Sequence, residues 1–597
     1  MRLLKVLKTK KTHFLMCLFI VLLVSCKDNQ ADRKVIDSSE GLEEFYINNL
    51  DVSISYLDSI LESSNKNTSR AYYLKSREQF KRVEPILAFA DPENYKALNQ
   101  PNITKIEEED ATDIKILEPF GFQVIEETIY EDDVEEEVLF KVVNKTKSRL
   151  TLIRNNIKLK FKDYHILWLI RDEIIRIALT GITGFDSPVL ENSLDEAVIA
   201  YSTIEHIFNL YESHFDRNTL LDAWHEEISK TGDLLINSDF ESFDRYEFIK
   251  NHTHKQLALI LETKEDWNVE FPYKLAFNND ITSLFSKRTF NLTYFASEKL
   301  DSLPENKVNI GEKLFFDKAL SKSNNMSCGT CHQPKLYFTD GMRISKGVTR
   351  NSPTLLYASL QKGFFYDNRA GSLEGQIVSV VKNENEFHSD LKHLEEAVGN
   401  NLQYSELFRK AYADSLNQDN IRNAIANYIR SLNPFNSKFD NNINRLENTL
   451  TTSEKSGFNL FMGKAKCATC HFPPTFNGTV PVLYKESEME LIGTPETNDT
   501  INPIIDDDLG RYYIFNTEER KHFFKTPTVR NSNKTAPYMH NGVFNTLEEV
   551  IAFYNQGGGI GLGMELENQT LPPDNLNLSA NETEDLRAFL KTLDDSI

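Results

Sequence analysis

Cysteine and histidine are scarce in this chain of 597 residues, which contains six cysteines and 13 histidines. Two of the cysteines, Cys17 and Cys26, fall in an apolar N-terminal segment. The other four form two Cys-x-x-Cys pairs, so none is left for an ordinary disulfide framework. The scarcity excludes a disulfide-stapled scaffold and directs attention to the two pairs.

The chain also has fewer basic than acidic residues and few long apolar runs. The formal net charge of −22 argues against nucleic acid as a partner and is compatible with a basic redox partner. After the N-terminal segment, no apolar run approaches the length of a membrane span. Tryptophan is limited to Trp168, Trp224 and Trp267, whose positions within apolar stripes are typical of core residues.

The N-terminal segment has the features of an export signal. A basic stretch precedes an apolar run from Phe14 to Val24, which is too short to span a bilayer but typical of a signal peptide. The run ends in LVSC, which resembles a bacterial lipoprotein box and implies cleavage before Cys26 and lipidation of its thiol. A plain secretory signal is the alternative. We therefore expect a signal peptide at 1–25 and a lipid anchor at Cys26, on the periplasmic or cell-surface face of a bacterial membrane.

A histidine directly follows each Cys-x-x-Cys pair, in SCGTCH and in KCATCH. This is the attachment pattern of c-type haem, in which two thiols bond to the vinyl groups and the imidazole ligates the iron. A zinc ribbon needs no histidine at both pairs, and a thioredoxin-like dithiol needs only one pair. The sequence therefore predicts two covalent haems, held by Cys328, Cys331 and His332 and by Cys467, Cys470 and His471.

Apolar residues recur at three- and four-residue steps from about Asp37 to Lys264, which predicts a helical domain. Asp37 is an N-cap candidate, and one long apolar stripe covers Leu150–Leu179. The pattern loosens around Leu284–Asn309, and helical stripes then return on both sides of the second haem motif. We expect a mainly α chain with a helical domain at 26–283, followed by two cytochrome c-like haem lobes packed face to face, at 284–450 and 451–597.

One segment of the helical domain, Glu118–Tyr130, resembles the Gly-x-His-x-x-Glu motif of imelysin-like periplasmic domains. The resemblance implies an imelysin-like fold and metal ligation through Glu126. Gln123 stands where that motif has histidine, and glutamine is a poor ligand for transition metals.

Five segments in residues 300–597 resemble the bacterial di-haem cytochrome c peroxidases and their MauG-type relatives: LFFDKALSKSNNMSCGTCHQP, TRNSPTLL, FFYDNRAGSLEGQ, FKTPTVRN and TAPYMHNG. The resemblance implies a peroxidatic haem in the first lobe, an electron-transfer haem in the second and a calcium ion between them. It also implies hydrogen peroxide as substrate and a small cytochrome or other redox donor as partner. The implied calcium ligands are Asn351 and the carbonyl groups of Thr535 and Pro537.

An iron that cleaves a peroxide needs an open distal face and a group that moves a proton between the two oxygens. The resemblance places that group at Glu386, 20 residues after Tyr366, and a second distal polar residue at Gln376. A carboxyl group in a haem pocket can have a raised pKa and act as both acid and base. Glu384 and His388 are the alternatives for this role.

The chain departs from the family pattern at two points between these motifs. Where the family has tryptophan in a W-D-G-R segment, this chain has Tyr366 in YDNR; oxidation of tyrosine releases a proton, so a relay through it needs a base nearby. Several of these peroxidases block the first iron with a histidine from the following loop. No histidine lies between His332 and His388, so we expect that site to be open without prior reduction.

The distal ligand of the second haem separates the two branches of the family. The peroxidases typically use methionine, whereas MauG-type enzymes have a tyrosine in a Tyr-Asn-x-Gly-Gly context, which Tyr554 matches in FYNQGGG. Met539 and Met564 are the alternatives. The leading interpretation is a di-haem peroxidase. The others are MauG-type oxidation of a protein or organic substrate, and a non-catalytic electron carrier or iron-linked sensor.

We predict that Cys26→Ser releases the mature protein from the membrane, because the acyl chains on this thiol supply the anchor. Membrane and soluble fractions of the producing cells, assayed for covalent haem, measure the change. A variant that stays in the membrane fraction would contradict the lipoprotein box.

Overall fold

The computed structural model describes residues 37–108, 112–131, 135–296 and 302–597. The expected signal peptide and Cys26 lie outside these residues. Within the described ranges, no helix is both long and apolar enough to cross a membrane. Helices dominate, as predicted, and the strands are limited to two short antiparallel pairs in this part of the chain.

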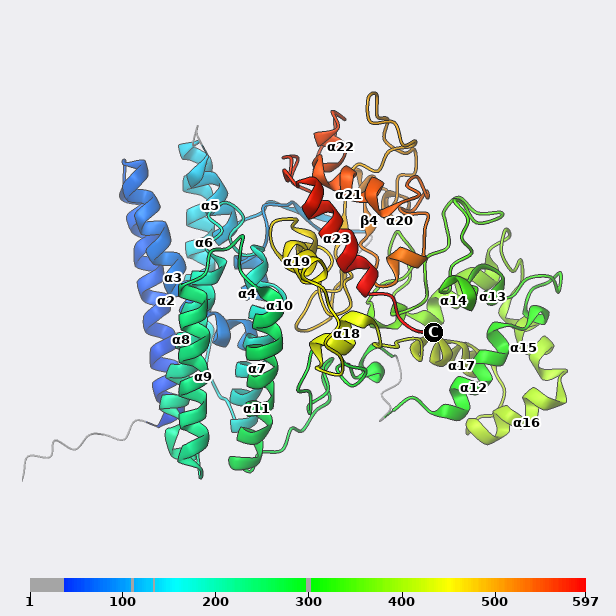
Figure 1. Cartoon of the computed structure of the whole chain (residues 1–597), viewed down its shortest axis with the longest axis horizontal. Coiled ribbons are helices and arrows are strands. Elements are labelled where there is room, and N and C mark those ends of the chain that lie inside the picture. Colours follow the sequence, from blue (N-terminus) through cyan, green and yellow to red (C-terminus); the bar gives the residue numbers. More distant parts are fainter. Residues whose placement is uncertain (1–36, 109–111, 132–134, 297–301) are drawn as a thin grey trace, which may run out of the picture.

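The first half of the chain is a bundle of long helices (Figure 1). Its helices are α2 (Ser38–Glu62), α3 (Lys66–Ala90), α4 (Pro92–Leu98), α5 (Phe122–Tyr130), α6 (Glu136–Asn156), α7 (Asp163–Leu179), α8 (Ser193–Leu210), α9 (Asn218–Ile236), α10 (Arg245–Phe248) and α11 (His254–Asp266). A hairpin of β1 (Lys105–Glu107) and β2 (Lys115–Leu117) projects from it, with Ile106 opposite Ile116. The predicted N-cap is confirmed, since the Asp37 carboxylate accepts a hydrogen bond from the Ser39 amide at 2.9 Å.

The long apolar stripe from Leu150 to Leu179 is two helices, so its interpretation as one element is wrong. The first helix, α6, ends at Asn156, and α7 begins at Asp163. Asparagine is a weak helix former because its side chain competes for backbone hydrogen bonds, and the Asn156 amide donates to the Leu152 carbonyl oxygen at 2.7 Å. The three tryptophans are buried, as expected.

Buried ion pairs hold the helices of this bundle together. Arg77 on α3 contacts Glu196 on α8, with 2.6 Å between Nε and Oε1, and Lys81 contacts Asp186 at 3.0 Å. All four side chains are buried, where charges persist only when they are paired. The register of α3 against α8 is therefore set by charge as well as by apolar packing.

The second half of the chain consists of shorter helices joined by long connections. The helices are α12 (Glu305–Phe315), α13 (Cys328–Cys331), α14 (Leu373–Lys382), α15 (Leu391–Gly399), α16 (Leu402–Ala411), α17 (Gln418–Arg430), α18 (Lys438–Ile443), α19 (Thr452–Met462), α20 (Tyr512–Phe515), α21 (Leu547–Asn555), α22 (Gly558–Gly561) and α23 (Ala580–Thr592). Strands β3 (Met489–Glu490) and β4 (Phe524–Lys525) form the second antiparallel pair.

In each lobe, a helix that precedes the haem motif crosses a helix that follows it. In the first lobe α12 packs against α17, and a Cβ at Gly311 would overlap the Ala424 carbonyl oxygen. In the second lobe α19 packs against α23, and a Cβ at Gly457 would overlap the Asp585 carbonyl oxygen. Both crossings therefore require glycine for the close approach of two backbones. This repetition agrees with the predicted pair of cytochrome c-like lobes.

The helical bundle packs against the second lobe, which separates it from the first lobe in Figure 1. Here α10 lies along α19: the Tyr246 amide donates to Asn459 at 3.0 Å, and Lys455 pairs with Glu247 at 2.7 Å. The hairpin β1–β2 extends the contact further along this lobe, because Arg520 donates to the Ile106 carbonyl oxygen at 3.2 Å. The bundle is thus attached to the haem-binding half at several places, which include a hydrogen bond from Arg445 to the Lys250 carbonyl oxygen at 3.1 Å.

We predict that Asp440→Asn lowers the free energy of unfolding by about 3–5 kcal/mol, because it leaves the buried Arg530 guanidinium without its carboxylate. The pair is bidentate, at 2.8 and 2.9 Å, and neither side chain is more than 1% exposed. Chemical denaturation of the haem-loaded protein measures the change. In the control Glu406→Gln, which breaks a surface pair with Lys410, the denaturation midpoint should not move.

Candidate active site

One internal cavity of about 1110 Å³ is lined by both Cys-x-x-Cys-His motifs. Pockets for one small molecule usually measure roughly 300–1,000 Å³, so this cavity exceeds the range for a single ligand. It runs across the junction of the two lobes and includes the loops that connect them. The fold therefore brings the two predicted haem sites, which are far apart in the sequence, to a shared interior.

Both motif histidines have the geometry of proximal iron ligands. The Nδ1 atom of His332 lies 3.0 Å from the Phe338 carbonyl oxygen, and that of His471 lies 2.9 Å from the Pro527 carbonyl oxygen. A proton on Nδ1 is donated to each carbonyl, which leaves Nε2 with a free lone pair. Burial lowers the pKa of both imidazoles, to about 4 for His471, and so keeps the rings neutral.

The four motif cysteines are free thiols, so they are available for thioether bonds to vinyl groups. Burial raises the pKa of Cys328 to about 12 and that of Cys331 to about 11. Imidazoles with a free Nε2 atom and an apolar cavity wall fit covalent haem. Within the described residues, the motif cysteines and histidines form no group of three ligand atoms close enough together for zinc. The residues present therefore suit two c-type haems.

At the first motif, the cavity wall includes two of the predicted distal residues, Gln376 on α14 and Glu386 in the loop that follows. The Glu386 carboxylate accepts a hydrogen bond from the Asn383 amide at 2.7 Å. Burial raises the pKa of Glu386, which favours the neutral carboxyl group. The two alternatives, Glu384 and His388, are exposed and do not line the cavity.

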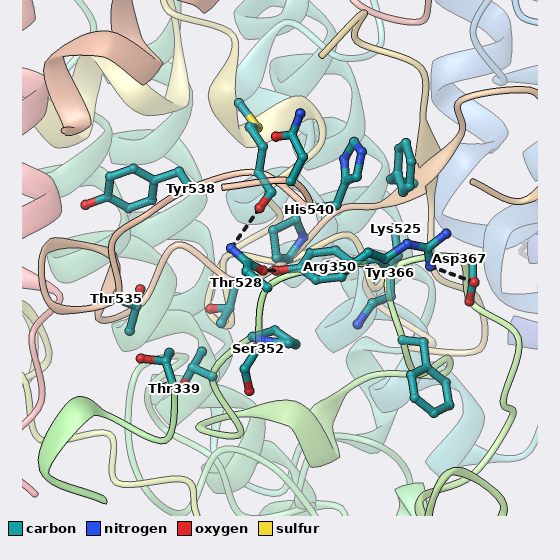
Figure 2. A pocket seen from close by; sticks show the side chains of 18 of the residues that line it. Thr339, Arg350, Ser352, Tyr366, Asp367, Lys525, Thr528, Thr535, Tyr538 and His540 are labelled. Carbon is teal, nitrogen blue, oxygen red and sulfur yellow. Dashed lines mark hydrogen bonds and ion pairs between the residues drawn. The ribbon is translucent and has the colours of Figure 1, made fainter. Parts of the chain in front are cut away.

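Tyr366 lies on the cavity wall between the lobes, next to Arg350 (Figure 2). Its hydroxyl group donates a hydrogen bond to the side-chain oxygen of Asn351, and its carbonyl oxygen accepts one from the Lys525 amide at 2.7 Å. Burial raises the pKa of Tyr366. An amide oxygen is a weak acceptor and not a base, so Asn351 does not supply the base that tyrosine oxidation was expected to need.

The predicted calcium ligands converge only in part. The Asn351 amide nitrogen donates to the carbonyl oxygens of Pro537 at 3.1 Å and Met539 at 2.9 Å. A half-turn of that amide would direct its oxygen at the same point as the two carbonyls, which is the donor set that a hard cation prefers. Thr535 lines the same cavity. Asn351 and Pro537 are therefore in direct contact, whereas Thr535 shares only the cavity wall with them.

At the second motif, Tyr554 on α21 and Met539 both line the cavity, whereas Met564 does not. The pKa of Tyr554 is raised by burial and by the nearby Cys470 and Cys467 thiols, which places its side chain beside the second motif. Of the three candidates for the distal ligand, Tyr554 and Met539 thus remain in reach of the second haem site.

Two buried ionisable residues of the cavity wall were not predicted. Lys525 on β4 donates to the Gln361 side-chain oxygen, and burial lowers its pKa to about 8. Glu490 on β3 lines the cavity near Cys470, and burial raises its pKa. Lys525 falls within the segment FKTPTVRN and could have been found there. Glu490 follows no motif, so only the packing of the loops identifies it.

Within the described residues, one cluster has histidine and carboxylate atoms close enough for a metal ion: Asp506, Asp508 and His540, whose ligand atoms lie within 4.8 Å of one another. These groups already have protein partners. His540 Nε2 lies 3.0 Å from an Asp506 oxygen, and the Arg350 guanidinium lies 2.6 Å from Asp508. Through Asp508, this cluster of the second lobe is joined to Arg350 of the first lobe.

The imelysin-like segment has no free ligand to offer. Glu126 is buried and accepts hydrogen bonds from the Tyr73 hydroxyl at 2.9 Å and from the Val189 and Leu190 amides at 3.0 Å. Gln123 donates to the Asn99 carbonyl oxygen at 2.8 Å. Because the Glu126 carboxylate is saturated by neutral protein donors, its role in this structure is to join α5 to the loop before α8.

Comparison with known proteins agrees with the assignment of two haem-binding motifs to this cavity. The model of the family described as di-haem cytochrome c peroxidase matches residues 305–448. Cytochrome-c peroxidase IdrP2 of Pseudomonas sp. (strain SCT) is 34% identical over 313 residues, which cover 48% of this chain and 80% of that protein. Cytochrome c551 peroxidase of Nitrosomonas europaea is 33% identical, covering 49% and 81%. Methylamine utilization protein MauG of Methylorubrum extorquens is 30% identical, covering 49% and 80%.

These relatives are matched over four fifths of their own length, and the cavity presents both haem-attachment motifs with neutral, correctly oriented histidines. The chain belongs to the di-haem cytochrome c peroxidase family.

Proposed function

We propose that this protein reduces hydrogen peroxide at the first haem site, with electrons that enter through the second. Two electrons and two protons convert one peroxide molecule into two water molecules. The observation that carries the proposal is the buried, hydrogen-bonded Glu386 in the same cavity as the first motif. When bound, the haem iron supplies the redox chemistry that breaks the oxygen–oxygen bond.

Glu386 is the proton carrier in this proposal. Its carboxylate form takes the proton from peroxide, and its carboxyl form returns that proton to the departing oxygen. Asn383 holds the side chain at 2.7 Å, and Gln376 presents an amide to the same cavity, where it orients the peroxide or a water molecule. Glu384 and His388 are exposed and do not line the cavity, so they would not reach a peroxide molecule in the interior.

Tyr366 is the electron relay between the two sites in this proposal. It lies on the cavity wall at the lobe junction, where the family pattern has tryptophan. Its hydroxyl group donates to the Asn351 amide oxygen, which is not a base, so in this proposal electrons tunnel past Tyr366 and the tyrosine is not itself oxidised. A small cytochrome or another redox donor supplies the electrons.

MauG-type oxidation of a protein or organic substrate is the second candidate function. The observation that favours it is Tyr554, whose side chain lies beside Cys470 in the cavity, as a tyrosinate ligand would require. Phenolate is a hard anionic ligand that stabilises ferric iron, so it suits storage of an oxidising equivalent more than acceptance of electrons from a donor.

The proposal also includes a metal ion, a membrane anchor and the division of the chain into units. We propose a calcium ion held by Asn351, Thr535 and Pro537. The hydrogen bonds from the Asn351 amide to the Pro537 and Met539 carbonyl oxygens support this proposal. We also propose a lipid anchor at Cys26 and a periplasmic or cell-surface location. The proposed units are 26–283, 284–450 and 451–597; α11 ends at Asp266 and α19 begins at Thr452, near two of these boundaries.

We predict that Glu386→Gln slows the reaction of the ferric protein with peroxide by roughly 10²–10⁴-fold, the usual contribution of a general acid–base group. Resting spectra of both haems should stay unchanged. In the wild type the rate should fall as the pH falls through the raised pKa of Glu386, because only the carboxylate accepts the proton, and this dependence should vanish in the variant. Stopped-flow absorbance between pH 4 and 9, roughly the range that brackets a raised glutamate pKa, measures both effects.

The matched control for this experiment is Glu384→Gln, which removes an exposed carboxylate two residues away. Its rate and pH profile should equal those of the wild type. If Glu386→Gln reacts as fast as the wild type, or if the control loses the activity instead, Glu386 is not the proton carrier.

We predict that Tyr554→Phe changes the spectrum of the second haem and raises its reduction potential by on the order of 100 mV, since axial ligands shift haem potentials over about 0.8 V. The first haem should keep its spectrum. Spectroelectrochemical titration measures both haems, and Met539→Leu is the control. A near-infrared methionine–iron band that survives Tyr554→Phe and disappears in Met539→Leu would reverse the assignment.

A further inference from the structure

The loop that carries Tyr366, residues 363–370, is held from several sides. We call it the relay loop. Its ends are joined by a hydrogen bond from the Phe364 amide to the Ala370 carbonyl oxygen at 2.9 Å. The Asp367 carboxylate accepts bonds from Arg350 at 2.7 Å and from Arg369 at 2.6 Å. These contacts come from within the first lobe and do not involve the helical bundle.

The Lys525 amide and the Arg511 side chain both reach the relay loop from the second lobe, and the Lys525 amide donates to the Tyr366 carbonyl oxygen at 2.7 Å. The Nη1 atom of Arg511 donates to the carbonyl oxygens of Asp367 at 3.1 Å and Asn368 at 2.8 Å, immediately after Tyr366. Asn368 has φ of +56°, a left-handed conformation that costs free energy for a non-glycine residue. Phe365, directly before Tyr366, is also left-handed, with φ of +65°. The guanidinium group thus supports the backbone at one of two such residues of the relay loop.

The helical bundle holds Arg511 in turn. Glu108, which follows β1 of the bundle's hairpin, contacts the Nε atom of Arg511 through Oε2 at 3.0 Å. The Glu108 side chain is 9% exposed and that of Arg511 is 13% exposed, so water screens the pair weakly. The backbone of the hairpin adds a second link, because Arg520 donates to the Ile106 carbonyl oxygen.

Glu108 is the carboxylate between two arginines. Its Oε1 atom lies 3.9 Å from Nε of Arg520. Burial lowers the pKa of Arg520, the Glu108 charge raises it, and the neighbouring Arg511 charge lowers it again. If Glu108 became neutral, the two guanidinium groups would repel each other in a poorly solvated place. Arg511 is the member of that pair that also supports the relay loop.

We propose that Glu108 is a positioning residue through which the helical bundle fixes the relay loop, and so the Tyr366 side chain, for electron transfer between the two haem sites. It acts through Arg511 and touches neither haem site. This inference rests on the proposed function, because it takes Tyr366 as the relay. It gives the bundle, which lies outside the residues matched by the family model, a defined part in the reaction.

The test uses the full-length, haem-loaded protein with Glu108→Gln, which keeps the size of the side chain and removes its charge. The matched control is Glu107→Gln. Glu107 is the preceding residue of the same hairpin, but its partner is the exposed Lys105, at 3.2 Å. Both variants lose one negative charge from the hairpin, and only the first loses contact with Arg511.

Two readouts are measured. Amide hydrogen exchange, followed by mass spectrometry, reports on residues 363–370 without any turnover. We expect exchange there to accelerate by roughly 2- to 30-fold in Glu108→Gln, the range for mutations that loosen a coupled contact, and not in Glu107→Gln. Stopped-flow spectra after addition of peroxide then separate the initial reaction at the first haem, expected to be unchanged, from the later change at the second, expected to slow by a similar factor.

The outcomes separate this inference from the proposed function. If the wild type does not react with peroxide, the proposed function fails, whereas exchange in the relay loop still tests the contact itself. If the wild type reacts and Glu108→Gln matches it in both readouts, the inference is wrong and the function stands. Glu108→Asp keeps the charge but withdraws it by one methylene group. It should give a smaller effect of the same sign, and it replaces Glu108→Gln if that variant does not load both haems.

Discussion

Buried arginine–carboxylate pairs hold the junction between the two haem lobes, and Arg350 bridges both lobes at the shared cavity. Arg350 donates to Asp367 in the relay loop at 2.7 Å and to Asp508 in the second lobe at 2.6 Å. Nearby, Asp506 pairs with His540, whose ring stacks on Phe524 with centroids 3.7 Å apart. Because these charges are poorly exposed, each needs its partner, and the lobes therefore meet in one arrangement. The shared cavity and the position of Tyr366 follow from that arrangement.

Pairing of opposite charges at buried positions recurs throughout this molecule. Inside the bundle it joins Arg77 to Glu196, and at the edge of the bundle it joins Glu108 to Arg511. Such pairs add little net stability compared with apolar packing, but they penalise every misaligned arrangement by leaving a charge unpaired. This property suits a protein whose electrons must pass between two cofactors at a fixed separation. The bundle is thus built into the haem unit, and Figure 1 shows it attached to the second lobe.

The buried acids and bases of the cavity share a physical cause. Desolvation raises the pKa of Glu386 and Glu490 and lowers that of Lys525, so each group is shifted toward its neutral form. The cavity wall can therefore hold these groups without the full cost of unpaired buried charges. Sequence spacing alone could not separate Glu386 from Glu384 or His388, because these residues lie within a single short loop. Glu386 is half-buried, whereas Glu384 and His388 are exposed, and this difference distinguishes them.

The sequence by itself determined the features that depend on covalent spacing along the chain. Two thiols and an imidazole within five residues define a haem-attachment site whatever surrounds them, and the three-and-four-residue apolar steps define helices. These local patterns do not show which residues become buried or which charged residues, distant in the sequence, come into contact. Arg511 and Glu108 are 403 positions apart. Glu126 matches a metal motif from which Gln123 departs, and in the fold both side chains are taken up by hydrogen bonds. Only the tertiary structure decides such features, because burial and long-range pairing are properties of the packed chain.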